Sequence, residues 1–437
     1  MTSIDTVVIG AGHAGLAVSS LLSSSGRDHV VLDRGGVAER WRTERWDSLH
    51  LLTPNWMTRL PGWSYRGQAP EGYLSAGGFV SYLEEYAASF DAPVQGSTWV
   101  EDVSLHEGRS DAGYTVSTSQ GTWSARHVVV ATGPWGRPHV PAGLERAGVP
   151  VVPASAYRNP GTLPPGGILV VGASASGVQI ADELARSGRD VVLAAGGHTR
   201  IPRHYRGMEI FWWLERTGRL SRTIDDSNEA ARLRAESSLQ LIGRNSSTAS
   251  AYPVDLAALQ DRGVQLVGRF DGVHHRAARF RDDLAESVAR SDARLQRLLT
   301  RIDDHVTAAR LTSEVLAAER PPPVPLPKPV TSIDLRSRGV STIIAATGYR
   351  PSFGWLRVPV LGADGSIQQR CGVTASPGLY VVGQPFQHRR DSGFIDGARH
   401  DAATVVAHLT QQVKAPTSVV PSTASKTSMS SSSGCAR

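Results

Sequence analysis

The chain has 437 residues, 40% of them hydrophobic and 20% charged, a composition that fits a soluble globular protein of two or three domains. Its 46 basic and 40 acidic side chains give a net charge of +6. The arginines are spread in singles and pairs, so we expect no nucleic-acid partner. The two cysteines, Cys371 and Cys435, exclude a disulfide framework, a Cys-x-x-Cys redox pair and a cysteine-rich zinc site.

The amino-terminal residues lack a basic region before the first apolar run, and no apolar stretch approaches the roughly 18 residues of a membrane span. We therefore expect no signal peptide, no membrane partner and a cytoplasmic location. The histidines do not have metal-ligand spacing, so we predict no metal site.

Residues 6–33 are predicted to form a strand, a glycine-rich turn, a helix and a second strand. A short β-branched run at 6–9 is followed by the sequence Gly-Ala-Gly-His-Ala-Gly at 10–15. Apolar side chains at helical spacing then continue to Gly26, which ends the helix. The next apolar run ends at Asp33.

This first unit is typical of a dinucleotide-binding fold. In Gly10-x-Gly12-x-x-Gly15 the first glycine allows a tight turn, the second lets a pyrophosphate approach the backbone, and the third lets helix and strand pack closely. The helix N-terminus then faces the phosphates. Because Asp33 can accept a hydrogen bond from a ribose hydroxyl, we expect an adenosine with a free ribose here, as in FAD.

The same unit returns at residues 168–193. Its three glycines, Gly172, Gly177 and Gly188, keep the spacing of the first copy, and an apolar strand stands on each side of the helix. Ser174 replaces the middle glycine, a position that tolerates a small side chain. The sequence therefore predicts a second dinucleotide site.

The second copy lacks the acid of the first, because Ala195 stands where Asp33 stands. Without a carboxylate the site does not repel a ribose 2′-phosphate. Just downstream lie His198, Arg200 and Arg203, which could bind that phosphate with charge-assisted hydrogen bonds. We therefore predict NADPH rather than NADH. The alternative is that both arginines are solvated surface charges.

Two apolar strands end in Ala-Thr-Gly, at residues 127–133 and 342–348. Both are expected where the chain leaves one nucleotide domain for the other.

The predicted fold class is α/β, with two Rossmann-like dinucleotide-binding domains, the NADP domain being inserted in a split FAD domain. Residues 321–329, rich in proline, are predicted to be a stiff linker that returns the chain to the first domain. The predicted divisions are 1–147 for the first part of the FAD domain, 148–330 for the NADP domain with a helical insertion at about 225–320, 331–414 for the second part of the FAD domain, and 415–437 for a compositionally disordered tail.

These features resemble the two-dinucleotide-binding-domain flavoproteins, and within them the class B flavin-containing monooxygenase superfamily. The resemblance runs from Thr6 to about Leu409. Residues 200–214 and 386–397 are similar to a bacterial subgroup of uncharacterised FAD/NAD(P)-dependent oxidoreductases.

The repeat and the resemblance together imply a set of cofactor contacts at the two glycine turns, along the flavin and at the last helix. The expected contacts are Gly10, Gly12, His13, Ala14, Gly15, Asp33, Arg34, Trp41, Trp46, Thr53, Thr132, Gly133, Gly172, Ser174, Ser176, Gly177, Arg200, Arg203, Thr347, Gly348, Gly383, Gln384 and Asp396.

The resemblance implies an NADPH-dependent FAD monooxygenase. Such an enzyme forms a C4a-(hydro)peroxyflavin with O2 and oxygenates a small amine, sulfide or carbonyl compound. No catalytic triad or metal cluster is needed for this chemistry. The candidate catalytic side chains are Asn55, which could hydrogen-bond the flavin peroxide or be an ordinary turn residue, and Arg389, which could bind an anionic substrate or cofactor group. The oligomeric state is open, with a homodimer as one candidate.

One motif departs from the family. The fingerprint Phe-x-Gly-x-x-x-His-x-x-x-Tyr/Trp, aligned on Tyr157, places Ala147, Val149 and Pro153 at its first three positions. Pro153 favours an alternative, an NAD(P)H-dependent flavin oxidoreductase or oxidase that inserts no oxygen. A third hypothesis is a flavin-dependent sensor without catalysis.

Overall fold

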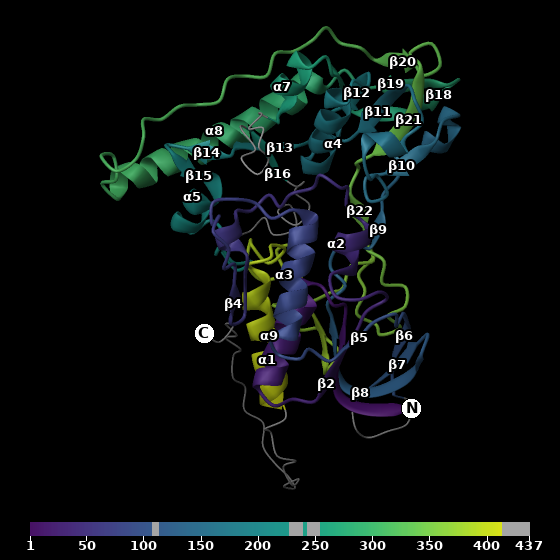
Figure 1. The fold of residues 1–437 in the computed structure, drawn as a ribbon, viewed down its shortest axis with the longest axis vertical. Helices are drawn as coiled ribbons and strands as arrows, with labels where there is room; N and C mark the ends of the chain where they lie inside the picture. The colour runs from purple at the N-terminus through teal and green to yellow at the C-terminus, as the bar shows by residue number, and fades with distance from the viewer. Residues whose placement is uncertain (107–112, 227–238, 243–253, 413–437) are drawn as a thin grey trace, which may run out of the picture.

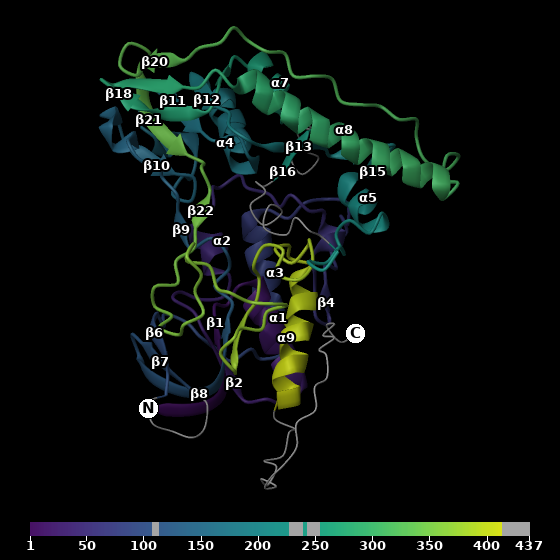
Figure 2. The ribbon, with the colours of Figure 1, turned by 180° about the vertical axis from the view of Figure 1, so that it is seen from behind.

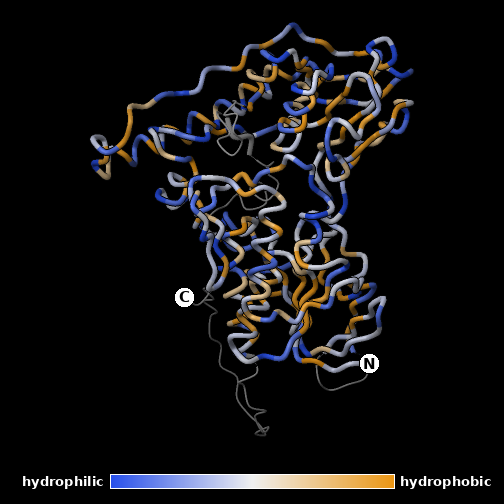
Figure 3. Tube along the Cα trace, in the orientation of Figure 1, coloured by the Kyte–Doolittle hydropathy of each residue, from blue (hydrophilic) through white to orange (hydrophobic). Residues whose placement is uncertain are grey.

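The chain forms two lobes stacked along its longest axis, each built on its own sheet (Figures 1 and 2). The computed structural model describes residues 1–106, 113–226, 239–242 and 254–412. Hydrophobic positions concentrate inside each lobe (Figure 3). The predicted tail at 415–437, with Cys435, lies outside the described residues.

The sheet of the first lobe has the strand order β5-β2-β1-β8-β7-β6, with β23 beside β8. Strands β1, β2, β5, β8 and β23 are parallel, and β6 and β7 add an antiparallel hairpin. The bounds are β1 Thr2–Ile9, β2 His29–Leu32, β5 Val94–Gln95, β6 Val100–Leu105, β7 Tyr114–Thr118, β8 Gly121–Val130 and β23 Leu379–Val381.

Three helices cover one face of this sheet. Because alternate residues of a strand face opposite sides, Val8 and Val129 pack with these helices, whereas Val7 and Val128 pack with the hairpin side. The helices are α1 His13–Ser24, α3 Ala76–Ala88 and α9 Ala398–Gln412. A short helix α2, Glu39–Thr43, and the two-residue strands β3 Arg59–Leu60 and β4 Trp63–Ser64 lie in the connection between β2 and α3.

The second lobe has an all-parallel sheet in the order β10-β21-β11-β12-β17. The bounds are β10 Val151–Pro153, β11 Gly167–Val171, α4 Ala175–Arg186, β12 Val191–Ala194, α7 Leu256–Asp261, β17 Gln265–Val267 and β21 Val340–Ala345. A three-stranded antiparallel sheet joins it, of β18 Phe270–His274, β19 Ala277–Phe280 and β20 Ser332–Asp334. This topology confirms the predicted α/β fold with two dinucleotide-binding domains.

The predicted domain boundaries need correction. Strands β20 and β21, assigned to the first domain by the boundary at 331, pair within the second lobe. Residues 321–329 lead to β20 and not to the first domain. Leu144 and Ala147, placed in the first domain, pack in the core of the second. The chain therefore crosses between the lobes before Leu144 and again after Ala345.

The predicted helical insertion at about 225–320 is helical only in part. Its main element is α8, a single 25-residue helix over Leu284–Ala308, whereas residues 254–280 also supply strands of the second lobe. Residues 227–238 and 243–253 of this prediction lie outside the described part of the chain. After α8 the chain runs back along that helix to β20 (Figure 1).

Two neighbouring crossings join the lobes. Strand β9, Arg137–Pro138, follows β8, and strand β22, Tyr349–Arg350, follows β21. They pair in antiparallel register, and the backbone N–H of His139 donates to the carbonyl of Gly348 over 2.8 Å. Strand β8 runs parallel to β1 and β23, and β21 runs parallel to β10 and β11, so the carboxyl ends of these parallel strands lie on the side from which β9 and β22 follow.

A second contact joins the lobes away from that junction. The segment after β12 contains β13 Thr199–Pro202, β14 His204–Tyr205, β15 Met208–Glu209 and α5 Ile210–Arg216. The N–H of Ile224 donates to the carbonyl of His388 over 2.8 Å, and the rings of Phe211 and Phe394 meet edge to face at 5.9 Å. Helices α5 and α8 share one core with Met57 of the first lobe.

Helix α8 is expected to be an integral part of this contact. Leu299 of α8 is fully buried in the core that α5 and Met57 share. Leu299→Ala should lower the free energy of unfolding by about 2–5 kcal/mol, because it leaves a cavity there. Guanidinium unfolding followed by tryptophan fluorescence measures the effect. Leu326→Ala removes a 52% exposed side chain and should change it by less than about 0.5 kcal/mol. Equal midpoints for the two variants would contradict this packing.

Candidate cofactor-binding site

The first glycine turn joins β1 to α1 and has one glycine that faces open space. Gly10 has φ +111°, and a Cβ there would lie 2.8 Å from the carbonyl oxygen of Ala131. A Cβ on Gly15 would overlap the carbonyl oxygen of Gly10. Gly12 is the N-cap of α1, and nothing lies within 4 Å of a Cβ placed on it. The turn is thus packed behind Gly10 and Gly15 and open in front of Gly12, as close approach of a phosphate requires.

The second glycine turn repeats this geometry between β11 and α4. Gly172 has φ +107°, and a Cβ there would overlap the carbonyl oxygen of Ala346. A Cβ on Gly177 would overlap the carbonyl oxygen of Gly172. Ser174 is the N-cap of α4, and its hydroxyl makes no capping hydrogen bond. Ser176 lies in the first turn of that helix.

The two Ala-Thr-Gly strand ends occupy equivalent places. Ala131 after β8 lies behind the first glycine turn, and Ala346 after β21 lies behind the second. Gly133 has φ +72° and Gly348 φ +83°, so both strands leave their sheets through a left-handed residue. Thr132 and Thr347 precede these glycines, and the hydroxyl of Thr347 donates to the carbonyl of His139. The two strand ends are therefore equivalent, as predicted. The second strand belongs to the second domain, however, and not to the first domain, to which the predicted boundaries assigned it.

Asp33 holds the first turn in shape. Its carboxylate accepts hydrogen bonds from the N–H groups of Ala11 at 2.8 Å and Gly35 at 3.0 Å. The carboxylate stands at the end of β2, where a ribose hydroxyl is bound in dinucleotide folds. Asp33 therefore follows the second strand as predicted, the backbone contacts fix the orientation of its side chain, and its contact with a ribose stays a prediction.

His13 opens α1 directly beside the turn. Burial lowers the pKa of its imidazole to about 4, so the ring is neutral near pH 7. Its Nε2 is buried and has no hydrogen-bond partner among the described residues. A buried polar atom without a partner at a phosphate turn fits a site that a ligand completes.

The end of β23 meets the start of α1. Gly383 has φ +77°, and a Cβ on it would lie 3.0 Å from the Cβ of Ala14. The side-chain amide nitrogen of Gln384 is buried and has no partner within the described chain. The structure thus places Gly383 against Ala14 at the first glycine turn, and the cofactor contacts of Ala14, Gly383 and Gln384 stay predictions.

The two candidate catalytic side chains already have partners within the chain. The amide of Asn55 donates to the carbonyl of Ala69 at 2.9 Å and accepts from the N–H of Leu74 at 2.7 Å. Arg389 forms two 3.0 Å hydrogen bonds to Asp391. The catalytic roles of Asn55 and Arg389 stay predictions, and both side chains hold local structure.

Asp396 binds two arginines. It accepts hydrogen bonds from Arg59 at 2.6 and 2.8 Å and from Arg399 at 2.9 Å. Asp396, Asp391 and His400 offer ligand atoms within 4.8 Å of one another, as a metal site would. The arginines that pair with both carboxylates supply the positive charge, so this cluster is an ion-pair network.

Arg200 and Arg203 are buried, so the alternative that they are solvated surface charges is wrong. Arg200 is 1% exposed, and its Nη1 lies 2.5 Å from Oδ1 of Asp292. Arg203 donates to the carbonyl of Leu52 at 3.0 Å, and its guanidinium lies 4.1 Å from the ring centre of Tyr73. Their predicted contact with a 2′-phosphate stays a prediction, which would require both side chains to exchange these partners.

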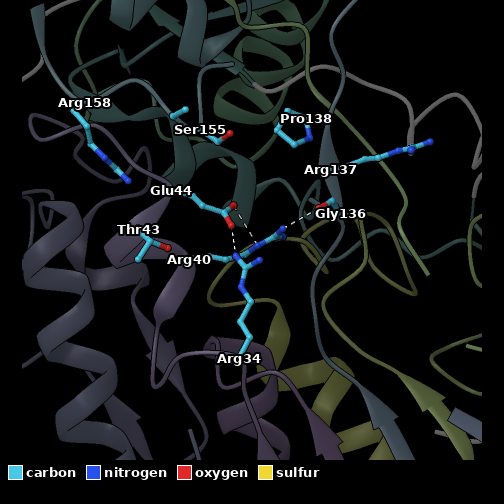
Figure 4. A pocket seen from close by; sticks show the side chains of 10 residues that line it. Arg34, Arg40, Thr43, Glu44, Gly136, Arg137, Pro138, Ser155 and Arg158 are labelled. Carbon is cyan, nitrogen blue, oxygen red and sulfur yellow. Dashed lines mark hydrogen bonds and ion pairs between the residues drawn. The ribbon is translucent and has the colours of Figure 1, made fainter. Parts of the chain in front are cut away.

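Tryptophans and an arginine-lined cavity lie beside α2. Trp41 meets Phe79 edge to face at 4.8 Å, Trp46 is buried, and Thr53 is half-buried. Close to α2, a cavity of about 440 Å³ opens between the lobes (Figure 4). It is lined by Arg34, Arg40, Thr43, Glu44, Gly136, Arg137, Pro138, Ser155, Ala156 and Arg158.

The charges of this cavity are only partly balanced. Glu44 pairs with both Arg34 and Arg40, and Arg40 also donates to the carbonyl of Gly136 at 3.1 Å (Figure 4). Arg137 and Arg158 line the same space. The predicted cofactor residue Arg34 thus lies beside the domain junction. Arg40 was not predicted from the sequence, because its place in the cavity depends on β9, far away in the chain.

The loop in which this chain departs from the family fingerprint motif borders this cavity. Pro153 ends β10 and pairs with Ala345 of β21. Ser155, two residues on, lines the cavity. Tyr157 is fully buried, and its hydroxyl donates to Glu183 at 2.7 Å. Tyr157, the one fingerprint residue that the chain retains, therefore holds the loop against α4 through this hydrogen bond.

Comparisons with known proteins agree with this geometry. Residues 7–206 match the family model described as pyridine nucleotide-disulphide oxidoreductase. An uncharacterized CzcO-like oxidoreductase of Geobacillus kaustophilus is 29% identical over 92% of this chain and 97% of its own length. A mutant form of a flavin monooxygenase from Stenotrophomonas maltophilia superposes with a TM-score of 0.62 at 20% identity, over 94% of this chain and all of that one.

These matches show the fold of the two-dinucleotide-binding-domain flavoproteins, and the predicted family resemblance agrees with them. The predicted oxidoreductase class and the predicted cofactors, FAD and a nicotinamide dinucleotide, are consistent with the same matches. A probable indole-3-pyruvate monooxygenase of Arabidopsis thaliana, YUCCA4, is 31% identical over 47% of this chain and 50% of its own length. Among the helices of the described residues, none has the length and apolar character that a membrane span needs.

Gly12→Ala tests whether the first glycine turn binds FAD. The added methyl group meets no protein atom but projects into the space in front of α1, so bound FAD should fall about tenfold or more while the protein still folds. The ratio of flavin to protein absorbance after purification measures this. Gly77→Ala also adds a methyl group in open space, on α3, and should keep its flavin. Full flavin content in Gly12→Ala would place the pyrophosphate elsewhere.

Proposed function

We propose that this protein is an NADPH-dependent FAD monooxygenase that transfers one oxygen atom of O2 to a small organic substrate. One observation carries the proposal: two glycine turns, each at the carboxyl end of a parallel sheet, lie toward one junction between the lobes, and the chain has no cysteine pair to receive the electrons. Cys371 and Cys435 are far apart in the sequence, and Cys371 is buried in the structure. A dithiol relay, as in disulfide reductases, is therefore excluded.

The cofactors would supply the redox chemistry, because a nicotinamide transfers a hydride to a flavin and a reduced flavin reacts with O2. The chain would supply binding and orientation. The turn at Gly12 and the carboxylate of Asp33 would hold FAD, and the turn at Ser174 would hold NADPH. Gly383 and Gln384 would border the flavin from the end of β23.

The structure of the junction supports a fixed relation between the two sites. Paired crossings at β9 and β22 hold one side, and α5 with the segment up to Ile224 holds the other. Two sites held in this way would keep their reacting groups oriented, which raises the rate of transfer. Water exclusion by the same contacts would protect the oxygenating step.

Pro153 supports a second candidate, a flavin oxidase or reductase without oxygen insertion. A proline has no side-chain donor or acceptor, so it offers nothing in place of a fingerprint histidine. Its φ is fixed, and it ends β10 beside the cavity. A homodimeric state and a cytoplasmic location stay predictions for either function.

Oxygen-18 incorporation separates the two candidates. The purified holoenzyme is incubated with NADPH, labelled O2 and a panel of amines, sulfides, ketones and aldehydes, and products are analysed by mass spectrometry. A monooxygenase gives one labelled oxygen atom in at least one product, and released H2O2 falls as that product forms. Release of H2O2 equal to the NADPH consumed, with every substrate, would establish the oxidase instead. Heat-denatured enzyme with free FAD is the control for uncatalysed oxidation.

A further inference from the structure

We propose that Arg269, and not Arg200 or Arg203, recognises the ribose 2′-phosphate of NADPH. The inference rests on the proposed use of NADPH and assigns the residue that selects it. Arg200 and Arg203 are buried in ion pairs and hydrogen bonds, whereas the side chain of Arg269 is 47% exposed at the carboxyl edge of the second sheet.

The internal repeat locates Arg269. In the first domain the N–H of Asp33 donates to the carbonyl of Gln95 in the neighbouring strand at 3.1 Å. In the second domain the N–H of Ala195 donates to the carbonyl of Val267 at 2.9 Å. These equivalent bonds align β5 with β17. Ser97 lies two residues after Gln95, and Arg269 lies two residues after Val267. Arg269 therefore corresponds to Ser97.

Comparison of the two domains shows an exchange of charge at the ribose position. The first domain has the carboxylate of Asp33 and the neutral Ser97, whereas the second has the neutral Ala195 and the guanidinium of Arg269. A carboxylate suits a ribose with a free 2′-hydroxyl, and a guanidinium suits a 2′-phosphate, which it binds through two parallel hydrogen bonds. Ala195, which replaces the acid, and Arg269, which adds the base, thus follow two adjacent strands, β12 and β17.

The guanidinium of Arg269 runs along the loop that follows β12. A Cβ on Gly196 would lie 3.5 Å from Nε of Arg269, and a Cβ on Gly197 would lie 3.8 Å from its Nη2. Because both residues are glycines, no side chain separates the guanidinium from the space above this loop. A phosphate carried by a ribose at Ala195 would enter that space.

The backbone of Arg269 is fixed although its side chain is half exposed. Its N–H donates to Oδ1 of Asp283 at 2.8 Å, and its carbonyl accepts from the N–H of Arg281 at 2.8 Å. The other oxygen of Asp283 lies 3.7 Å from Nε of Arg269. Asp283 thus holds the side chain at Nε, while Nη2 lies beside Gly197.

Fragments of the cofactor test this assignment without turnover. Isothermal titration of the FAD-loaded protein compares adenosine 2′,5′-bisphosphate with adenosine 5′-monophosphate, which differ only in the 2′-phosphate. The wild type should bind the bisphosphate at least tenfold more tightly. Arg269→Ala should weaken bisphosphate binding by about tenfold to a hundredfold and leave monophosphate binding within about twofold. Arg269→Lys, which keeps the charge but not the fork of donors, should lose less.

Arg290→Ala is the matched control, because it removes an exposed arginine of α8 that pairs with Glu286. It should leave both affinities within about twofold. Unchanged bisphosphate binding in Arg269→Ala, or equal loss of both fragments, would overturn the assignment while NADPH use could stand. Failure of the wild type to bind either fragment would overturn the assignment together with the proposed function.

Discussion

The close approach of each glycine turn to the strand behind it is the constraint on which the rest of the structure depends. A side chain on Gly10 or Gly172 would meet the carbonyl oxygen of Ala131 or Ala346 in the strand end behind the turn. A side chain on Gly15 or Gly177 would overlap the carbonyl oxygen of the first glycine of the same turn. This packing sets each helix N-terminus at the carboxyl edge of its sheet, where the strand behind the turn also leaves for the other lobe. The same contact therefore fixes the proposed phosphate site and the position of the domain junction.

The glycine turns could be predicted from the sequence because their chemistry is local. A tight turn, a close approach and a helix start within six residues leave a readable pattern at Gly10 and again at Gly172. The positions of Asp33 and of both Ala-Thr-Gly strand ends followed from the same repeat. Even the replacement of an acid by Ala195 was visible, because it stands at a fixed distance from the turn.

Features that depend on contacts between residues far apart in the sequence could not be predicted in this way. The strand ending at Ala345 was assigned to the wrong lobe, because its partners β10 and β11 lie far upstream and the proline-rich stretch before it suggested a boundary. Arg200 and Arg203 looked available because the sequence does not show that Asp292, Leu52 and Tyr73 enclose them. Arg269 was missed for the same reason, since only the pairing of β12 with β17 brings it beside Ala195.

The two turns are proposed to hold two cofactors that exchange a hydride across the junction. Anaerobic titration of the FAD-loaded protein with NADPH tests this most directly, followed by the flavin absorbance near about 450 nm. Stoichiometric bleaching under argon, faster with NADPH than with NADH, is the predicted result. A flavin that stays oxidised in the presence of excess NADPH would contradict hydride transfer and leave this protein as a flavin-binding protein without that reaction.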